Sequence, residues 1–413
     1  MRILLLSHYF PPEVNAPANR THEHARCWVA DGHDVTVITG VPNHPRGEIF
    51  PGYRNRVLQQ ETIDGIRVIR TWTYVTPNEG FLKRTLNYVL FAIAAVLASL
   101  RADRPDVVIA TSPQFFVGLA GAVVARLRRR PFVLEVRDLW PDSIVQLGQL
   151  RQRWIIRSLE AIESALYRSA AGIVVVTRAF ADHIAARGIP RERIAFVPNG
   201  IDPKLFHRRS PGSAEHELLR QHGLEGKFLV AYIGTLGLAH GLVTLVDAAE
   251  RLRHEKEIVF LLIGDGADRG RIEAEIARRG LDNVRLLGLR PRAEIPHWLS
   301  ITHLTLVMLR DLPVFATVIP SKVFEFLAQE RPMLLAAPNG EIRGLVEETK
   351  AGITIEPEDP DALARAVLFV RDHPGEAAAR ARAGREWVER EYLRDKLARR
   401  MASFLEHTVQ AAR

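Results

Sequence analysis

One stretch in the second half of the chain combines a proline, a serine, a lysine and a glutamate at a spacing that suits anion binding. Pro320 fits the entry of a helix, Ser321 its cap and Lys322 its first turn, so backbone amides and an ammonium group would face one anion. Glu325 follows one helical turn later, where its carboxylate can accept hydrogen bonds from a pair of sugar hydroxyls. The pattern predicts a nucleotide diphosphate site. A solvent-exposed ion pair on the helix face is the alternative.

Two loops upstream carry glycine between a strand and a helix. Gly234, Gly237 and Gly241 occupy the first loop, where the missing side chain lets backbone amides approach a phosphate. The second loop, residues 263–269, follows the next strand. Tight turns also need glycine, and Asp268 can cap a helix, so both loops also have a purely structural interpretation. The predicted nucleotide site comprises Gly234, Thr235, Gly237, His240, Gly241, Asp265, Gly266, Arg269, Leu287, Pro320, Ser321, Lys322 and Glu325.

In the first half, a predicted strand ends in Glu-Val-Arg-Asp-Leu-Trp-Pro-Asp, residues 135–142. Arg137 and Asp138 then stand beyond the strand end, where a carboxylate can orient a hydroxyl or balance charge that develops at a sugar carbon. We predict both as catalytic, and a cap of the next segment is the alternative for Asp138. The loop at residues 7–16 lies at the same face and contains no glycine, so it lacks the dinucleotide-binding pattern expected at this turn.

Metal chemistry has little support in the sequence. The one D-x-D pattern, Asp359-Pro-Asp361, precedes a predicted helix and is typical of a turn with a cap. Fifteen histidines lack the spacing of metal ligands, and the single cysteine, Cys27, excludes a cysteine-rich zinc or iron–sulfur site. We therefore predict no metal and no cofactor.

These residues must be positioned by alternating strands and helices, a pattern that predicts parallel sheets with crossover helices. Strands are expected at 2–6, 34–39, 66–70, 107–111, 132–136, 172–176 and 194–197, and again at 228–233, 258–263, 284–287, 304–308 and 333–336. A chain of 413 residues exceeds one ordinary core. The expected fold class is α/β, with two doubly wound Rossmann-like domains that face each other across a deep cleft. The active site is expected at the carboxyl ends of the strands.

A turn-rich segment near the midpoint, residues 198–203, holds two prolines and a glycine and is the predicted hinge. The expected domains are residues 1–200 and residues 201–389. A long charged helix is expected from 386 to about 405, and its apolar positions need a partner surface. The terminal helix at about 390–413 can cross back onto the first domain.

Charge is concentrated in residues 81–130, where eight basic residues face two acidic ones, a net charge of +6 out of +8 for the chain. The basic residues flank an apolar helix predicted at 86–100, which favours a surface that lies on anionic lipid headgroups. A buried helix with solvated arginines at its ends is the alternative. Nucleic-acid binding is disfavoured because no aromatic residues interleave with the basic cluster.

The longest apolar run, residues 89–100, has 12 residues, against about 20 needed to cross a bilayer. The apolar run at residues 3–6 is too short for the core of a signal peptide. We therefore expect a cytoplasmic protein that is peripheral on the inner face of the plasma membrane.

Six motifs, spread over essentially the whole chain, resemble the family 4 retaining glycosyltransferases of GT-B fold. They lie at residues 7–13 (Ser-His-Tyr-Phe-Pro-Pro-Glu), 32–39, 43–47, 135–142, 198–202 and 320–325. Within that family they are most similar to bacterial surface-polysaccharide transferases of O-antigen or capsule synthesis. Those enzymes are of the type that adds N-acetylfucosamine to an undecaprenyl-diphosphate-linked sugar.

The resemblance implies a nucleotide-sugar donor, with UDP as the expected nucleotide, held mainly by the C-terminal domain. It implies a polyprenyl-linked saccharide acceptor held by the N-terminal domain. His8, Asn15 and Ala16 are predicted to contact that acceptor. In the family's usual mechanism the leaving diphosphate helps to deprotonate the acceptor on the same face of the sugar, so the anomeric configuration is retained.

Three positions depart from the family pattern, and one of them is His240, where the family tends to have a basic residue before the glycine at 241. Glu325 corresponds to the second glutamate of an E-x7-E motif, which holds the donor ribose, but the first glutamate falls at Thr317. Contact to the transferred sugar must therefore pass to a neighbour or to backbone amides. Arg137 stands where the family has a histidine, so the diphosphate charge would rest on Lys322, a helix dipole and Arg137 or Arg269.

The expected function is thus a hexosyltransferase in enzyme class 2.4. A nucleotide-sugar epimerase or hydrolase of the same fold remains an alternative. A basic, non-catalytic protein that binds membranes or nucleic acid is the alternative from another class, suggested by the sequence pI of about 9.8.

Overall fold

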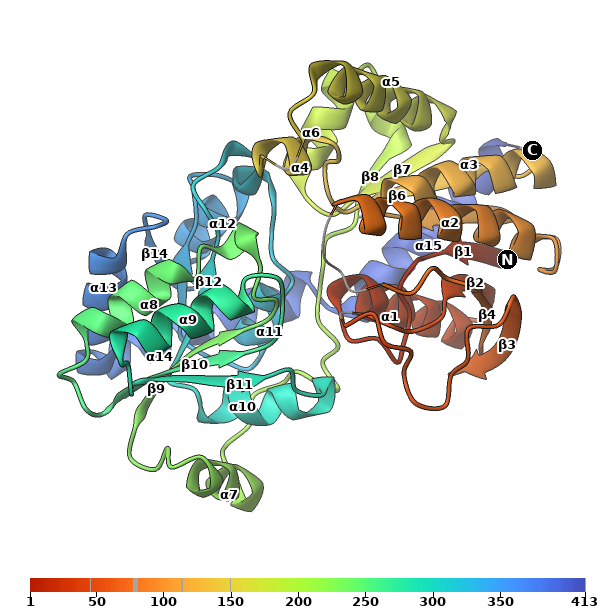
Figure 1. The fold of residues 1–413 in the computed structure, drawn as a ribbon. Coiled ribbons are helices and arrows are strands. Elements are labelled where there is room, and N and C mark those ends of the chain that lie inside the picture. The colour runs from red at the N-terminus through yellow and green to blue at the C-terminus, as the bar shows by residue number, and fades with distance from the viewer. Residues whose placement is uncertain (45, 77–80, 113, 149, 413) are drawn as a thin grey trace. The chain divides into compact units, whose positions relative to one another are not determined.

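The computed structural model describes residues 1–44, 46–76, 81–112, 114–148 and 150–412. The chain folds as two units, one formed by Met1–Pro198 with Arg394–Arg413 and the other by Asn199–Leu393. We call them the first and second unit. Each contains one sheet with helices packed around it (Figure 1). The motif at 43–47 includes Pro45, which lies outside the described residues.

The first unit has an eight-stranded sheet in the order β3-β4-β2-β1-β5-β6-β7-β8. The strands are β1 (Arg2–Leu6), β2 (Asp34–Gly40), β3 (Leu58–Ile63), β4 (Ile66–Thr71), β5 (Val107–Thr111), β6 (Phe132–Val136), β7 (Gly172–Val175) and β8 (Ile194–Phe196). All neighbours are parallel except β3 and β4. The chain builds outward from β1 in both directions, which is the topology of a doubly wound sheet.

β3 is absent from the strands that the sequence predicts. It is an edge strand with polar residues and no fully buried side chain, so it lacks the apolar run of a central strand. The sequence feature that indicates this strand is the Asp64-Gly65 turn that follows it. Both residues have positive φ, at 50° and 78°, as a tight hairpin turn requires.

Helices cover this sheet on both faces. They are α1 (Ala16–Ala30), α2 (Phe81–Ser99), α3 (Phe115–Arg128), α4 (Asp142–Gln146), α5 (Arg153–Ser169), α6 (Arg178–Ala186) and α15 (Arg394–Ala411). Leu397, Met401 and Leu405 of α15 are buried in a core shared with β1, β2 and α1. The Trp28 indole of α1 donates a hydrogen bond to the Ala398 carbonyl at 2.9 Å. The terminal helix therefore belongs to the first unit.

The helix expected from 386 to about 405 is in fact two helices, so this prediction was wrong. α14 (Pro374–Glu391) ends before Tyr392, and α15 begins at Arg394. Between them, Leu393 forms an isolated parallel bridge with Ile201, whose amide donates to the Tyr392 carbonyl at 2.9 Å. The helical pattern is interrupted because these two residues pair with a segment that is distant in sequence.

The second unit has a six-stranded parallel sheet in the order β11-β10-β9-β12-β13-β14. Its strands are β9 (Phe228–Ile233), β10 (Ile258–Ile263), β11 (Val284–Gly288), β12 (Leu304–Met308), β13 (Met333–Ala336) and β14 (Ile353–Ile355). Its helices are α7 (Ser213–Gln221), α8 (Val243–Arg251), α9 (Arg269–Arg279), α10 (Ile295–Ile301), α11 (Lys322–Ala328), α12 (Glu341–Thr349), α13 (Pro360–Asp372) and α14. The central strand β10 is buried throughout, and β9 is buried at every residue after Phe228, because helices cover both faces.

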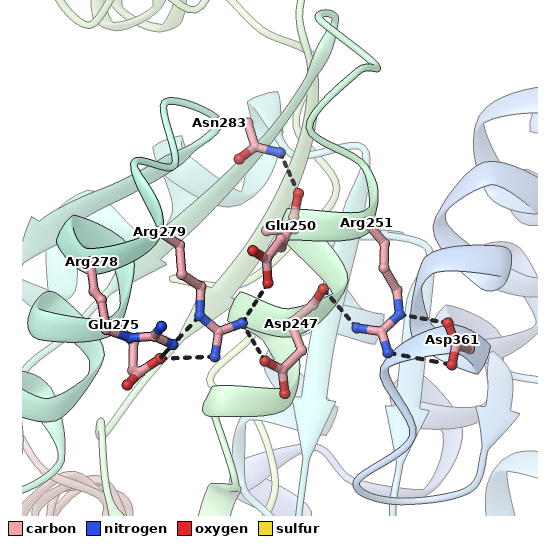
Figure 2. Close-up of polar contacts among 9 residues, drawn as sticks. Asp247, Glu250, Arg251, Glu275, Arg278, Arg279, Asn283 and Asp361 are labelled. Carbon is pink, nitrogen blue, oxygen red and sulfur yellow. Dashed lines mark hydrogen bonds and ion pairs between the residues drawn. The ribbon is translucent and has the colours of Figure 1, made fainter.

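Ion pairs hold α8 and α9 together (Figure 2). Arg279 of α9 is mostly buried and pairs with Asp247 and Glu250 of α8, and with Glu275 of its own helix. The two helices start directly after the two glycine-rich loops, so this network fixes the position of the helices that follow those loops.

Asp359, from the D-x-D pattern, caps α13 by accepting hydrogen bonds from the amides of residues 361 and 362, each at 2.9 Å.

In the part of the chain that the structure describes, no helix is both long and apolar enough to cross a bilayer.

Candidate active site

The two glycine-rich loops of the second unit pack backbone against backbone. Gly234, Gly264 and Gly266 have φ of 141°, 149° and 159°, which side chains rarely allow. A Cβ atom on Gly264 would lie 1.8 Å from the Gly234 carbonyl oxygen, and one on Gly266 would lie 2.4 Å from the Leu236 carbonyl oxygen. Glycine is therefore required here for close backbone approach.

Lys322 reaches from the start of α11 to the first of these loops. Its Nζ lies 3.8 Å from the centre of the Tyr232 ring, and a Cβ on Gly234 would come within 2.7 Å of it. This Nζ is buried and has no hydrogen-bond partner among the described residues. Burial lowers the pKa of Lys322 to about 7. The loop thus lies against a buried amine whose ammonium form makes no hydrogen bond with a described residue, although the Tyr232 ring and the Glu325 carboxylate offset part of the cost of burying its charge.

Glu325 does not form the surface ion pair that was the alternative for this helix. Its carboxylate pairs at 3.0 Å with Arg292, which lies in a short 3-10 turn at Arg292–Glu294, and both side chains are largely buried. The Arg292 guanidinium also lies over the Phe206 ring, 5.1 Å from its centre. Arg292 is not among the predicted site residues, because 33 residues separate it from Glu325 and no local spacing links them.

The remaining residues of the predicted nucleotide site are less open to an anion. Arg269 pairs with Glu273 at 2.9 Å and with Asp265 at 3.6 Å, so its charge is already compensated. The His240 ring contacts the Met308 carbonyl at 3.0 Å, and burial lowers the pKa of His240 to about 3, so the ring is neutral. Ser321 occupies the predicted cap position, but its side chain makes no capping hydrogen bond.

The other predicted positions line the same strand ends. Thr235 is exposed, while Gly237, Gly241, Leu287 and Pro320 are half-buried. The Thr317 hydroxyl, at the position of the missing glutamate, donates to the Val314 carbonyl at 2.7 Å.

In the first unit, Arg137 and Asp138 follow β6. The Arg137 guanidinium donates to the carbonyl oxygens of Ala16 at 3.0 Å and Pro17 at 3.4 Å, and burial lowers the pKa of Arg137 to about 9. Asp138 is half-buried and accepts a hydrogen bond from the Ser143 hydroxyl at 3.2 Å. Burial raises the pKa of Asp138 to about 6. Both groups thus have partners within the unit.

Of the three predicted acceptor residues, one contacts Arg137. The Asn15 carboxamide oxygen caps α1 at 2.9 Å from the Ala18 amide, and its nitrogen is buried without a partner. Ala16 contributes the carbonyl that Arg137 contacts. His8 is buried with its ring centre 4.4 Å from that of Phe91, and burial lowers the pKa of His8 to about 3.

Glu13 lies in the same loop as these residues but is not among the predicted site residues. Its buried carboxylate accepts hydrogen bonds from the amides of Asn43 at 3.0 Å and His44 at 2.9 Å. Burial raises the pKa of Glu13 to about 7. Glu13 joins the loops after β1 and β2, and its only sequence signal was its place in the 7–13 motif.

No group of three histidine, cysteine, aspartate or glutamate side chains among the described residues is arranged to hold a metal ion.

Two family models match the chain. The Glycosyl transferase 4-like domain matches residues 15–200, and the Glycosyl transferases group 1 model matches residues 215–387. The 2-deoxystreptamine glucosyltransferase of Streptomyces kanamyceticus is 30% identical over 299 residues, which is 68% of this chain and 71% of that protein. A protein of Escherichia coli named as a colanic acid biosynthesis glycosyl transferase, WcaI, is 27% identical over 88% of this chain and 90% of its own length.

Solved structures agree on the fold. The Anabaena protein HepE, in complex with UDP and glucose, has a TM-score of 0.72 at 18% identity and covers 98% of this chain and 99% of its own. Sucrose-phosphate synthase from Thermosynechococcus elongatus has a TM-score of 0.77 at 19% identity, with 99% of both chains covered. Together with the two Rossmann-like sheets, these matches confirm the expected fold class. The chain belongs to the glycosyltransferases of GT-B fold, with a family 4-like first domain and a group 1 second domain.

Proposed function

We propose that this glycosyltransferase moves a sugar from UDP to a saccharide linked to undecaprenyl diphosphate, with retention of configuration, during synthesis of a surface polysaccharide. Support for the pathway comes from WcaI, named for colanic acid biosynthesis. A Pseudomonas aeruginosa glycosyltransferase, WbjE, is 26% identical over 66% of this chain and supports the reaction class. Support for the nucleotide comes from the fold neighbour HepE, solved with UDP. Transfer of N-acetylfucosamine, in O-antigen or capsule synthesis, is the specific form that the motifs favour.

The observation that carries the proposal is the buried Nζ of Lys322. Keeping an ammonium group away from water without a partner is costly, and its lowered pKa reports that cost. A diphosphate beside the loop at Gly234 would supply the missing counter-charge. The same anion would meet backbone amides of the glycine-rich loops. Lys322 would then neutralise the diphosphate in place of a metal ion.

The Glu325 carboxylate is suited to bind the nucleoside part of the donor. Glu325 is held in one orientation by Arg292, which leaves carboxylate lone pairs free to accept hydrogen bonds from ribose hydroxyls. In the first unit, Asp138 and Arg137 would orient the acceptor hydroxyl. As the sugar–phosphate bond breaks, the leaving diphosphate takes the proton from that hydroxyl.

A thermal-shift screen of the full-length protein tests the donor. We expect UDP and UDP-sugars to raise Tm more than GDP, ADP or UMP, because ligands that bind the native state stabilise it. A larger shift with GDP, or no shift with any nucleotide, would contradict the proposal. Incubating each UDP-sugar with and without farnesyl-diphosphate-linked N-acetylglucosamine, in EDTA, then separates transfer from epimerisation or hydrolysis.

We further propose that the first unit binds an anionic membrane surface through the outer faces of α2, α3 and α5. The structure describes fourteen exposed large hydrophobic side chains, and eight of them lie on or beside these helices. They are Leu86, Ile93, Leu97, Leu100, Val123, Leu127, Trp154 and Ile162. α2 and α3 run side by side, and α3 also contacts α5 (Figure 1). We call this the α2/α3/α5 surface.

Exposed basic residues accompany the apolar ones. They are Lys83, Arg101, Arg104, Arg126 and Arg129 beside α2 and α3, and Arg151, Arg153 and Arg157 around Trp154. Apolar insertion and attraction to anionic lipid together are what stable peripheral binding needs. Pro113 and the side chains of Phe81 and Leu82, within the 81–130 segment, lie outside the described residues.

Co-sedimentation with phosphatidylglycerol vesicles tests this surface. We expect salt-sensitive binding that Leu97→Glu with Leu127→Glu abolishes, while Val57→Glu, at an 84% exposed residue of the first unit, leaves it unchanged. Equal binding by all three proteins would contradict the proposal. RNA binding in place of vesicle binding would favour the non-catalytic alternative.

A further inference from the structure

A fully buried arginine, Arg20 of α1, joins two segments that are far apart in the sequence. It is 2% exposed and makes three hydrogen bonds. Its Nε donates to the Glu135 carboxylate at 2.8 Å, and its two terminal nitrogens donate to the carbonyls of Pro198 at 2.6 Å and Val197 at 2.8 Å. A guanidinium group can hold three acceptors at fixed angles, which a lysine cannot.

The partners of Arg20 have distinct positions. Glu135 is the penultimate residue of β6, two residues before Arg137. Val197 and Pro198 are the last residues of the first unit before the chain enters the second. Arg20 therefore ties the end of the strand that carries Arg137 and Asp138 to the segment by which the chain leaves the unit.

The same helix also holds the chain where it returns. Arg394, the first residue of α15, pairs with Glu23 of α1 at 2.7 Å, and both side chains are buried. At its start, α1 presents the carbonyls of Ala16 and Pro17 to Arg137. One helix of 15 residues thus contacts the outgoing chain, the returning chain and Arg137.

We propose that Arg20 is a positioning residue for sugar transfer: it fixes the end of β6, and with it Arg137 and Asp138, in register with the outgoing chain. This inference rests on the proposed function. Catalytic groups must be held within a fraction of an ångström, so a small shift at the strand end lowers turnover without touching the donor site.

Arg20→Lys is the first test. We expect kcat to fall by about 10- to 100-fold, because small displacements of catalytic groups cost this much, while the Kd for UDP stays within twofold. The assay measures UDP release from the UDP-sugar found in the donor screen, with farnesyl-diphosphate-linked N-acetylglucosamine as acceptor.

Arg70→Lys is the matched control. Arg70 is also 2% exposed and lies in the first unit, and it also bonds one carboxylate and two carbonyls, those of Glu61, Gly40 and Pro11. We expect it to lower Tm as much as Arg20→Lys does and, because Arg70 holds Pro11 in the loop of the predicted acceptor residues, to raise the acceptor KM with a change in kcat below threefold. Equal losses of kcat in both variants would overturn the inference, because a general loss of stability would then explain them.

The double variant Arg20→Met with Glu135→Met separates positioning from charge balance. Losing Arg20 alone leaves the buried Glu135 carboxylate without its ion pair, which destabilises the fold although Arg137 and the Thr111 hydroxyl remain near it, and removing both charges relieves that cost. We expect Tm to recover while kcat remains low, because the bonds to residues 197 and 198 are still missing. Recovery of kcat together with Tm would overturn the inference.

A wild-type enzyme that transfers no sugar would overturn the proposed function, and this inference with it.

Discussion

The two units hold the charged side chains of the proposed function in different ways. In the second unit, the Lys322 amine is buried beside the glycine-rich loops with no hydrogen-bond partner. In the first unit, Arg137 donates to two backbone carbonyls and Asp138 accepts from Ser143. On the proposed donor side a buried amine thus lacks a hydrogen-bond partner until an anion binds, whereas the proposed catalytic side chains already have hydrogen-bond partners. We therefore expect changes in the second unit to alter donor affinity, and changes in the first to alter turnover.

The largest expected effect is on stability, from a substitution in the glycine-rich loops of the proposed donor side. Gly264→Ala would place a Cβ atom 1.8 Å from the Gly234 carbonyl oxygen at a φ of 149°. Backbone strain and overlap together should lower the free energy of unfolding by about 4 kcal/mol. Urea unfolding measures this free energy. The control is Gly270→Ala in α9, where no atom lies within 4 Å of the added Cβ, and it should raise the free energy of unfolding by up to about 1 kcal/mol. Similar values for both variants would contradict the role given to the loop packing.

Lys322→Met tests the incomplete charge directly. Loss of a buried cation that meets the diphosphate should raise the Kd for UDP by about 100-fold, or about 2.7 kcal/mol. The unliganded variant should be at least as stable as the wild type, because the buried amine is gone. Titration calorimetry and thermal unfolding measure the two effects. Lys256→Met, at a side chain that is 74% exposed, is the control and should change neither. An unchanged Kd in Lys322→Met would remove the main support for the donor site.

Asp138→Asn tests whether the first unit controls turnover and not donor affinity. We expect kcat to fall by roughly 30-fold, less than for a fully enclosed charge stabiliser because solvent reaches this half-buried side chain. The Kd for UDP should stay within twofold, since Asp138 lies in the first unit. Steady-state kinetics and calorimetry on the same preparation provide both numbers. A large change in Kd with little change in kcat would reverse the roles that we assign to the units.

The smallest expected effect is a proton count. Because the pKa of Lys322 is lowered to about 7, the unliganded amine is mostly neutral at pH 8. A bound diphosphate favours the ammonium form and raises that pKa, so UDP binding at pH 8 should take up close to one proton. Calorimetry in two buffers of different ionisation enthalpy measures the uptake. Lys322→Met should show none, and equal enthalpies in the two buffers for the wild type would argue against a titrating lysine.

Local patterns in the sequence predicted the central strands of both sheets and the glycine-rich loops that follow them. Apolar runs predicted the central strands, because strands covered on both faces are apolar throughout. Glycine between a strand and a helix predicted the crowded loops at Gly234 and Gly266. The polar edge strand β3 and the break at residues 392–393 escaped, because each depends on a pairing partner rather than on its own composition.

The sequence by itself determined which residue types stand at the strand ends, and the motifs among them were sufficient to indicate the family. Only the tertiary structure decided how their charges are compensated. It paired Glu325 with Arg292 and Arg20 with Glu135, and it left Lys322 without a hydrogen-bond partner among the described residues. Such pairings form between residues 33 or 115 positions apart, so they depend on how the chain packs and leave no mark on local spacing.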